Sequence, residues 1–257
     1  MSPMAVGKPT SAGLTASLLT AVRDRVPEEQ RLLIRQRLSR LFRPAWLGTV
    51  RRTSPLSDAW GYDRGTPVDR YYIEAFLNQY RQDIRGRVLE VKDSGYSDRF
   101  GSGVAQSHVL DIDPANPHAT VIADLSAADG IASEQFDCFV LTQTLQFIYD
   151  LRAAIQHAYR ILRPNGVLLV TVPGISPLDR RLTDYWHLTA ASCSTLFGEV
   201  FGPQNVTIYS YGNMLAAIAF LTGMARQELS EPELDVNDRR FPVIIAVRAV
   251  KREGGTP

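Results

Sequence analysis

Four strand-like runs decide the fold of this chain: Arg87-Val-Leu-Glu-Val91, His108-Val-Leu-Asp-Ile112, Phe136-Asp-Cys-Phe-Val-Leu141 and Gly166-Val-Leu-Leu-Val-Thr-Val172. Glu90 and Asp111 lie at the ends of the first two runs, and Asp124 follows the short run Thr120-Val-Ile-Ala123. In an open α/β sheet, ligands bind outside the carboxyl ends of the strands. The stretch from Arg87 to Pro173 therefore predicts carboxylates along the ligand-binding edge of a sheet.

Helical patterns alternate with these runs and indicate an α/β fold. Strands that alternate with helices are typical of a parallel sheet, and a closing pair of strands near the C-terminus is compatible with an antiparallel edge. We predict helices at 69–80, 150–162, 189–201 and 214–227, and two further strands at 206–211 and 242–250.

The composition is that of an ordinary globular protein. The 257 residues carry a net charge of +1, which does not favour electrostatic binding of nucleic acid by the whole molecule. The two cysteines do not resemble a disulfide framework, so a reducing, cytoplasmic location is expected. No run of about 18 apolar residues indicates a membrane-spanning helix, and the N-terminus lacks the pattern of a signal peptide.

The N-terminal part differs from the rest in charge. Residues 1–60 contain ten Lys and Arg against four Asp and Glu. We interpret 1–68 as a helical lid or extension whose first residues are disordered, and 69–257 as the catalytic domain. The basic helix predicted over 14–43 is either a solvated helix packed on the core, or a basic lid, or a docking surface for an acidic substrate, a membrane surface or a partner. A homodimer or a protein partner is possible through this helix.

The ordered set of motifs resembles the class I S-adenosylmethionine (SAM) dependent methyltransferases over residues 70–250. Val88-Leu-Glu-Val91 resembles the first-strand motif, and Val109-Leu-Asp-Ile-Asp-Pro114 resembles the end of the second strand. Ala123-Asp-Leu125 resembles the segment that contacts adenine. The fourth strand with its polar turn, Phe136 to Asp150, is the nearest match, and Ile161 to Leu168 resembles the turn before the fifth strand.

The resemblance implies a Rossmann-like, mostly parallel seven-stranded sheet with helices on both faces, and SAM as the cofactor. It implies that Asp111 holds the ribose hydroxyls, with Asp113 next best, and that Asp124 accepts a hydrogen bond from the adenine amino group. The residues implied to contact the cofactor are Glu90, Gly95, Asp111, Ile112, Asp124, Leu125, Thr142 and Gln143.

One segment departs from the family pattern. The family follows its first strand with Gly-x-Gly-x-Gly, because the backbone passes close to the cofactor there. Here Lys92 and Asp93 stand where small residues are expected, and Gly95 is the only glycine near the turn. The loop is either reshaped and still binds SAM, or has lost the cofactor and left the fold for another task.

Candidate substrate and catalytic residues lie in two segments. The loop after the fifth strand contains Asp184-Tyr-Trp-His187, in which His187 or Asp184 is the candidate general base and Tyr185 and Trp186 are candidates for holding a ring or sugar. The alternative is that the two aromatics pack under the loop and that His187 caps the next helix. From the preceding segment, Tyr62, Arg64 and Tyr72 are candidates for lining the acceptor side. No residue cluster has metal-ligand spacing, so no metal is expected.

These residues favour SAM-dependent O-methylation of a small molecule, such as a natural product or saccharide. The near-neutral charge and the aromatic loop favour a small acceptor over nucleic acid. The alternative is a relative that does not methylate, either a cyclase or lyase type enzyme or a non-catalytic partner protein.

Overall fold

The computed structural model describes residues 27, 30, 31, 34 and 48–252 of the chain. Contacts between Cα atoms divide the chain into two units, Met1–Thr53 and Ser54–Pro257. The first unit contains the short 3₁₀ helix η1 (Gly48–Val50), and the basic helix expected over 14–43 lies outside the described residues except at isolated positions. The second unit begins at Ser54 and therefore includes the segment 54–67 together with the sheet.

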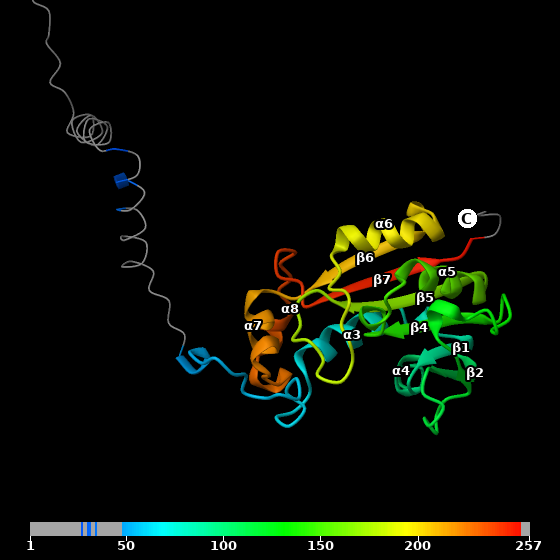
Figure 1. The fold of residues 1–257 in the computed structure, drawn as a ribbon, viewed down its shortest axis with the longest axis horizontal. Coiled ribbons are helices and arrows are strands. Elements are labelled where there is room, and N and C mark those ends of the chain that lie inside the picture. The colour runs from blue at the N-terminus through cyan, green and yellow to red at the C-terminus, as the bar shows by residue number, and fades with distance from the viewer. Residues whose placement is uncertain (1–26, 28–29, 32–33, 35–47, 253–257) are drawn as a thin grey trace, which may run out of the picture. The chain divides into compact units, whose positions relative to one another are not determined.

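Seven strands form one sheet in the order β3-β2-β1-β4-β5-β7-β6 (Figure 1). The pairs from β3 to β5 are parallel, whereas β7 is antiparallel to both of its neighbours, β5 and β6. The mostly parallel seven-stranded sheet predicted from the sequence is therefore confirmed. The strands are β1 (Gly86–Val91), β2 (Val104–Asp111), β3 (Val121–Ile122), β4 (Phe136–Thr142), β5 (Leu162–Pro173), β6 (Val206–Tyr211) and β7 (Ile244–Val250).

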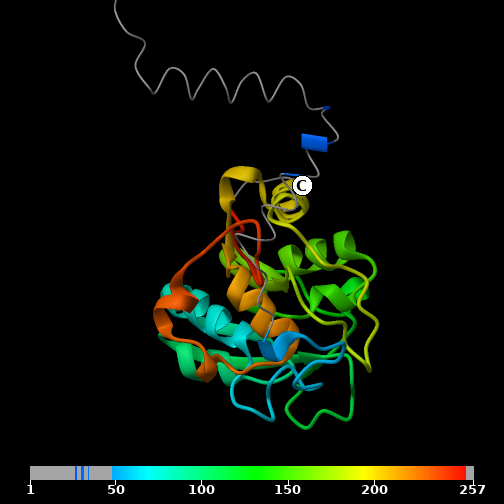
Figure 2. The same ribbon diagram turned by 90° about the vertical axis from the view of Figure 1, so that its left-hand side faces the viewer.

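Helices cover both faces of the sheet, and each face has its own apolar core. One core joins α5 and α6 to the sheet, and the other joins α3, α4 and α7 to the opposite face (Figure 2). The helices are α3 (Val68–Gln79), α4 (Gly95–Phe100), α5 (Leu151–Ile161), α6 (Ala190–Phe201), α7 (Met214–Thr222) and α8 (Glu231–Asp235), with 3₁₀ helices η2 (Arg81–Asp83), η3 (Leu125–Ala127), η4 (Leu145–Phe147), η5 (Pro203–Asn205) and η6 (Arg226–Glu228). No helix in the described part of the chain is long and apolar enough to span a membrane.

The central strands are apolar without alternation because helices cover them on both sides. In β4, Phe139 packs into the core of α5 and α6, and Cys138 and Val140 pack into the core of α3 and α7. Continuous apolar runs are typical of parallel strands buried on both faces. Cys138 and Cys193 are both buried and free, as expected for cysteines that act as small apolar residues.

The helix predicted over 214–227 is shorter in the structure. Gly223 adopts a left-handed conformation, with φ of 75°, and ends α7 at Thr222. Glycine adopts this conformation without a steric penalty, which makes it a common helix stop. The apolar residues continue up to this stop, so the sequence pattern predicts a longer helix than the one that forms.

The start of α7 is held by one buried side chain. Asn213 accepts a hydrogen bond from the Ala216 amide at 3.0 Å, and its Nδ2 donates to the carbonyl groups of Glu233 and Val236, each at 2.7 Å. This single residue therefore caps α7 and also ties it to the segment around α8.

We predict that Asn213→Ala lowers the free energy of unfolding by about 3 kcal/mol, because it removes a helix cap and leaves two carbonyl groups without their donor. Thr189→Ala is the matched control, since Thr189 caps only the exposed start of α6, and we expect it to cost about 1 kcal/mol. Urea unfolding of the two variants measures the difference. Equal losses would contradict the linking role of Asn213.

Candidate functional site

The candidate site lies at the carboxyl ends of β1, β2 and β4. The sheet order places β1 between β2 and β4. The chain first adds β2 and β3 on one side of β1 and then adds β4 and β5 on the other side, so the direction of strand addition reverses at the boundary between β1 and β4. Such a switch point leaves a crevice at the carboxyl ends of the two strands, where open α/β sheets bind ligands. The predicted cofactor residues belong to the strands on both sides of this crevice and to the segments that follow them.

Glu90, near the end of β1, is the most buried carboxyl group of the site. Its two oxygens accept hydrogen bonds from the amides of Tyr96 and Ser97 in α4, at 3.0 and 2.7 Å. Burial raises the pKa of Glu90 to about 7, and the two amide donors oppose this shift without overcoming it. Glu90 thus fixes α4 against the end of β1.

The turn between β1 and α4 contains no glycine until Gly95. Lys92 adopts a left-handed backbone conformation with φ of 72°, and its amide donates to the Leu110 carbonyl at 2.9 Å. The Asp93 carboxylate accepts from the Gly95 amide at 2.8 Å. The turn is therefore held by side-chain and cross-strand hydrogen bonds, with a lysine in a conformation that usually favours glycine.

Asp111 ends β2 beside an exposed apolar residue. Its carboxylate accepts from the Asp113 amide at 3.0 Å and from Asn116 Nδ2 at 2.6 Å. Partial burial acts to raise the pKa of Asp111, but these hydrogen bonds outweigh it and hold that pKa below its usual range. Ile112 is 67% exposed. An ionised acceptor next to an uncovered apolar side chain suits a ribose and a base.

Asn116 is a site residue that the sequence analysis missed. Its Nδ2 donates both to Asp111 and to the Lys92 carbonyl at 2.7 Å, so it joins the end of β2 to the turn after β1. The only sequence signal was its place in the Asp113-Pro-Ala-Asn-Pro117 turn. That signal predicts a turn but not the partner of the side chain.

Asp124 and Leu125 follow β3 and have different surroundings. The Ala123 amide donates to the Asp111 carbonyl at 3.0 Å, which brings the two strand ends together. Asp124 is exposed, and its Oδ1 accepts from the amide and the hydroxyl of Ser126. Leu125 is buried in the core beneath α5, so its side chain has almost no surface left for a ligand.

Thr142 is the last residue of β4 and Gln143 follows it, on the other side of the crevice. The Gln143 amide donates to the Thr171 carbonyl at 2.8 Å, and the Gln143 backbone is left-handed with φ of 47°. Three residues later, Gln146 Nε2 donates to the Gln143 carbonyl at 3.0 Å, whereas Gln146 Oε1 is buried with no hydrogen-bond partner in the described structure. Gln146 was not predicted as a site residue, because a polar residue beside apolar ones carries no signal of its surroundings.

The loop between β5 and α6 forms an exposed aromatic cluster with the segment after β4. The rings of Tyr149 and Tyr185 lie 5.4 Å apart, and those of Tyr149 and Trp186 lie 6.2 Å apart. Trp186 Nε1 donates to the Ile148 carbonyl at 3.0 Å, so this residue is anchored rather than free to pack under the loop. His187 is exposed next to the cluster. Tyr149 was not among the residues selected from the sequence.

Asp184 holds the backbone of the same loop. Its Oδ2 accepts from the Asp179 amide at 2.6 Å. Asp179 in turn accepts from the amides of Arg181 and Leu182. These contacts favour a positioning role for Asp184 over that of a general base.

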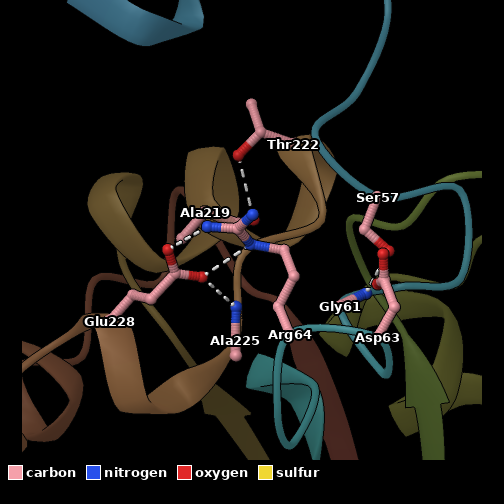
Figure 3. A network of polar contacts seen from close by, with 8 residues as sticks. All are labelled: Ser57, Gly61, Asp63, Arg64, Ala219, Thr222, Ala225 and Glu228. Atoms are coloured by element: carbon pink, nitrogen blue, oxygen red, sulfur yellow. Dashed lines mark hydrogen bonds and ion pairs between the residues drawn. The ribbon is translucent and has the colours of Figure 1, made fainter.

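The segment 54–67 is fastened to the segment after α7 (Figure 3). Arg64 forms a bidentate ion pair with Glu228, in which Nε lies 3.0 Å from Oε2 and Nη2 lies 2.5 Å from Oε1. Glu228 also accepts from the Ala225 amide at 2.8 Å, and Ser57 donates to Asp63. The guanidinium of Arg64, expected to bind substrate, therefore already has an anionic partner.

The two tyrosines expected to line the acceptor side have different positions. Tyr62 is exposed, and its hydroxyl accepts from Arg70 Nε at 3.1 Å. Tyr72 is only 2% exposed, and its hydroxyl donates to the Leu234 carbonyl at 3.1 Å. Its position in the core conflicts with the expectation that Tyr72 contacts a substrate.

Among the residues that the structure describes, no group of three or more His, Cys, Asp or Glu side chains is arranged to hold a metal ion. The polar groups of the site are carboxylates, amides, hydroxyls, guanidinium groups and the His187 imidazole. This set suits an organic ligand with several hydrogen-bonding groups.

Comparison with known proteins identifies the fold. A family model described as a methyltransferase domain matches residues 99–170. The phosphoethanolamine N-methyltransferase 2 of Haemonchus contortus, solved with S-adenosyl-L-methionine, has a TM-score of 0.50 and 14% identity, covering 80% of this chain and 55% of that one. The chain has a methyltransferase fold. The resemblance to class I SAM-dependent methyltransferases is therefore confirmed.

Two further solved structures are similar at the same low level of identity. A SAM-dependent methyltransferase from Archaeoglobus fulgidus has a TM-score of 0.48 and 15% identity, covering 71% of this chain and 94% of that one. The [4+2]-cyclase SpnF has a TM-score of 0.47 and 14% identity, covering 79% of this chain and 88% of that one. No curated protein matches the chain by sequence. At such identities, likeness to solved structures establishes the methyltransferase fold alone.

The raised pKa of Glu90 predicts a pH-dependent contribution to stability. The folded protein retains a proton on Glu90 up to about pH 7, whereas the unfolded chain releases it at lower pH, so the contribution is lost as pH rises. Relative to Glu90→Gln, which cannot ionise, we expect the wild type to lose about 2 kcal/mol of unfolding free energy between about pH 5 and 8. Urea unfolding across this range measures it.

Glu199→Gln is the control, because Glu199 is exposed and pairs with Arg152 at the surface. The difference in unfolding free energy between Glu199→Gln and the wild type should stay constant over the same pH range. A constant difference for Glu90→Gln as well would show that Glu90 is ionised in the folded protein throughout.

Proposed function

We propose that the chain is a SAM-dependent methyltransferase that acts on a small molecule, and that it transfers the methyl group to an oxygen atom. The observation that carries the proposal is the end of β2, where the ionised Asp111 stands beside the exposed Ile112. A ribose with two hydroxyls and a flat apolar base complements these two neighbours. This pair is adjacent to the β1–β4 crevice of a methyltransferase fold.

The side chains at the strand ends assign a role to each part of the cofactor. Asp111 accepts from the ribose hydroxyls, Ile112 covers the base, and Asp124 uses its free Oδ2 to accept from the amino group of the base. Thr142 and Gln143 line the opposite side of the crevice. When bound, SAM supplies an activated methyl group, so the hard part of the chemistry belongs to the cofactor.

Positioning the acceptor is the main task left to the protein. In-line methyl transfer needs an aligned acceptor atom and little else. The exposed cluster of Tyr149, Tyr185 and Trp186 offers ring faces to a sugar or aromatic acceptor. His187 beside it removes the proton from the acceptor hydroxyl. The net charge of +1 supports a small acceptor over nucleic acid, and we place the reaction in the cytoplasm.

One observation favours the alternative, a methyltransferase-fold protein that does not methylate. The turn after β1 carries Lys92 at a left-handed position and leads directly into Tyr96, which is partly buried against the core of α3 and α7. These larger side chains take up space beside the crevice. A cyclase or lyase type enzyme, or a non-catalytic partner protein, can use the same fold without methyl transfer.

Calorimetric titration with S-adenosylhomocysteine tests the cofactor assignment. We expect micromolar binding by the wild type and about tenfold weaker binding by Asp111→Asn, because the ionised acceptor for the ribose is lost. Asp113→Asn is the matched control: Asp113 is exposed and accepts only from the Ala115 amide, so its affinity should be unchanged. Absence of binding by the wild type would favour the alternative function.

Mass spectrometry of products from a panel of phenols and sugars tests the general base. We expect His187→Ala to lower the turnover of a methylated acceptor by about 100-fold with unchanged affinity for S-adenosylhomocysteine, because only proton removal is affected. Turnover at the wild-type rate would assign His187 to the loop structure instead. An enzyme that forms a product without added methyl mass would support the cyclase or lyase reading.

A further inference from the structure

Helix α7 leaves an apolar face uncovered. One side of the helix is buried in the core that it shares with α3, through Ala216, Ala219 and Phe220. The opposite side exposes four apolar side chains at helical spacing, each between 39% and 56% exposed: Met214, Leu215, Ile218 and Leu221. By contrast, the exposed positions of α5 and α6 include polar side chains such as Arg152, Gln156, Thr195 and Glu199.

The loop after β5 exposes two leucines with two arginines between them. Leu178 and Leu182 are 66% and 55% exposed, and Arg180 and Arg181 are exposed as well. The Asp179 carboxylate accepts from the amides of Arg181 and Leu182, at 2.6 and 2.9 Å, so the backbone of this turn is held in place. Arginine stems cover apolar surface while their charged ends stay in water. This arrangement suits the boundary between an apolar phase and a charged one.

One short segment connects this loop with the end of α7. The Leu56 amide donates to the Thr222 carbonyl at 2.7 Å. Two residues later, Asp58 forms an ion pair with Arg180, also at 2.7 Å. The loop and the end of α7 therefore lie on either side of the segment 56–58. We call their six exposed apolar side chains the apolar patch: Leu178, Leu182, Met214, Leu215, Ile218 and Leu221.

The apolar patch begins at the carboxyl edge of the sheet. Because β7 is antiparallel to both β5 and β6, the strands β5 and β6 run in the same direction. The loop follows the end of β5, and α7 begins shortly after β6 ends at Tyr211 (Figure 1). Exposed apolar surface of this kind marks contact with a protein or a membrane. A partner that covers the patch approaches the edge at which the cofactor residues lie.

The charge of the N-terminal extension distinguishes between these partners. Residues 1–47 contain eight Lys and Arg against three Asp and Glu. The second unit begins at Ser54, and Leu56 is already bonded to the end of α7. A second copy of the chain would bring the same excess of positive charge, and the two excesses repel each other. An anionic lipid surface instead attracts Lys and Arg that are held near it.

We propose that the apolar patch docks on the surface of a membrane that contains anionic lipids. The apolar face of α7 and the two leucines of the loop insert between the headgroups, as the apolar face of an interfacial helix does. Arg180, Arg181 and the charges of the extension attract the lipid phosphates. The helix has only nine residues, so it lies on the membrane and does not span it. The docking needs neither cofactor nor acceptor and does not depend on the proposed methyl transfer.

Sedimentation of the full chain with lipid vesicles tests the docking. We expect binding to vesicles of phosphatidylcholine mixed with phosphatidylglycerol, weakened by added salt, and weaker binding to phosphatidylcholine alone. Leu178→Gln with Leu182→Gln, and separately Met214→Gln with Leu221→Gln, should each lower the partition constant about tenfold or more, because the apolar side chains no longer gain from burial. Arg181→Gln should lower it about fivefold, and for the mixed vesicles only.

Ile122→Gln is the matched control for the apolar substitutions. Ile122 is 49% exposed, and it belongs to β3, at the opposite edge of the sheet from β6. Its substitution removes an exposed apolar side chain outside the apolar patch, so the variant should bind both kinds of vesicle as the wild type does. Thermal unfolding of each variant checks that the fold is retained.

Three results would overturn the docking. The first is that the wild type does not bind the mixed vesicles. The second is that the apolar variants bind them as well as the wild type does, because charge alone then accounts for the attraction. The third comes from sedimentation velocity of the free protein: a dimer that Met214→Gln with Leu221→Gln dissociates would assign the face of α7 to a second copy. None of these measurements involves SAM, so each leaves the proposed function as it stands.

Discussion

The hydrogen bonds from the Tyr96 and Ser97 amides to Glu90 are the contacts on which the candidate site depends. The helix α4 has only six residues, too few to be stable without tertiary contacts. The buried carboxylate supplies two acceptors for amides that the helix itself leaves unpaired at its start. Because α4 is fixed at the end of β1, the first turn of α3 and the turn after β1 have fixed neighbours as well.

The segment 54–67 is held just as firmly, although it contains no regular secondary structure before α3. Pro67 forms an isolated antiparallel bridge with Ala225. Gly61, with φ of 92°, passes so close to the segment after α7 that an added Cβ would lie 2.7 Å from the Met224 carbonyl oxygen. Glycine is required there by both the conformation and the close approach. The start of α3 is thus fixed by α4 on one side and by this segment on the other.

The sequence predicted the sheet well because strand runs and helix faces are local patterns. Glu90 and Asp111 stood at recognisable strand ends, and the structure places them there. The contacts of individual side chains at the candidate site depend on partners that are distant in the chain, and these were not predicted. The helix predicted over 69–80 includes Tyr72, but the sequence does not show that the Tyr72 side chain is buried and bonds to the Leu234 carbonyl, whereas Tyr62 is exposed. In the same way, the sequence does not indicate that Arg64 pairs with Glu228, because Glu228 lies 164 positions later in the chain.

The same limit explains why two buried oxygen atoms, Asp69 Oδ1 and Gln146 Oε1, could not be recognised from the sequence. An acid in the first turn of a helix is ordinary, because it favours the positive end of the helix dipole. Only the structure reveals that Asp69 Oδ1 is buried and has no donor among the residues that it describes. Unpaired buried acceptors lower the stability of the ligand-free protein, and this cost is repaid when a ligand supplies the missing donors.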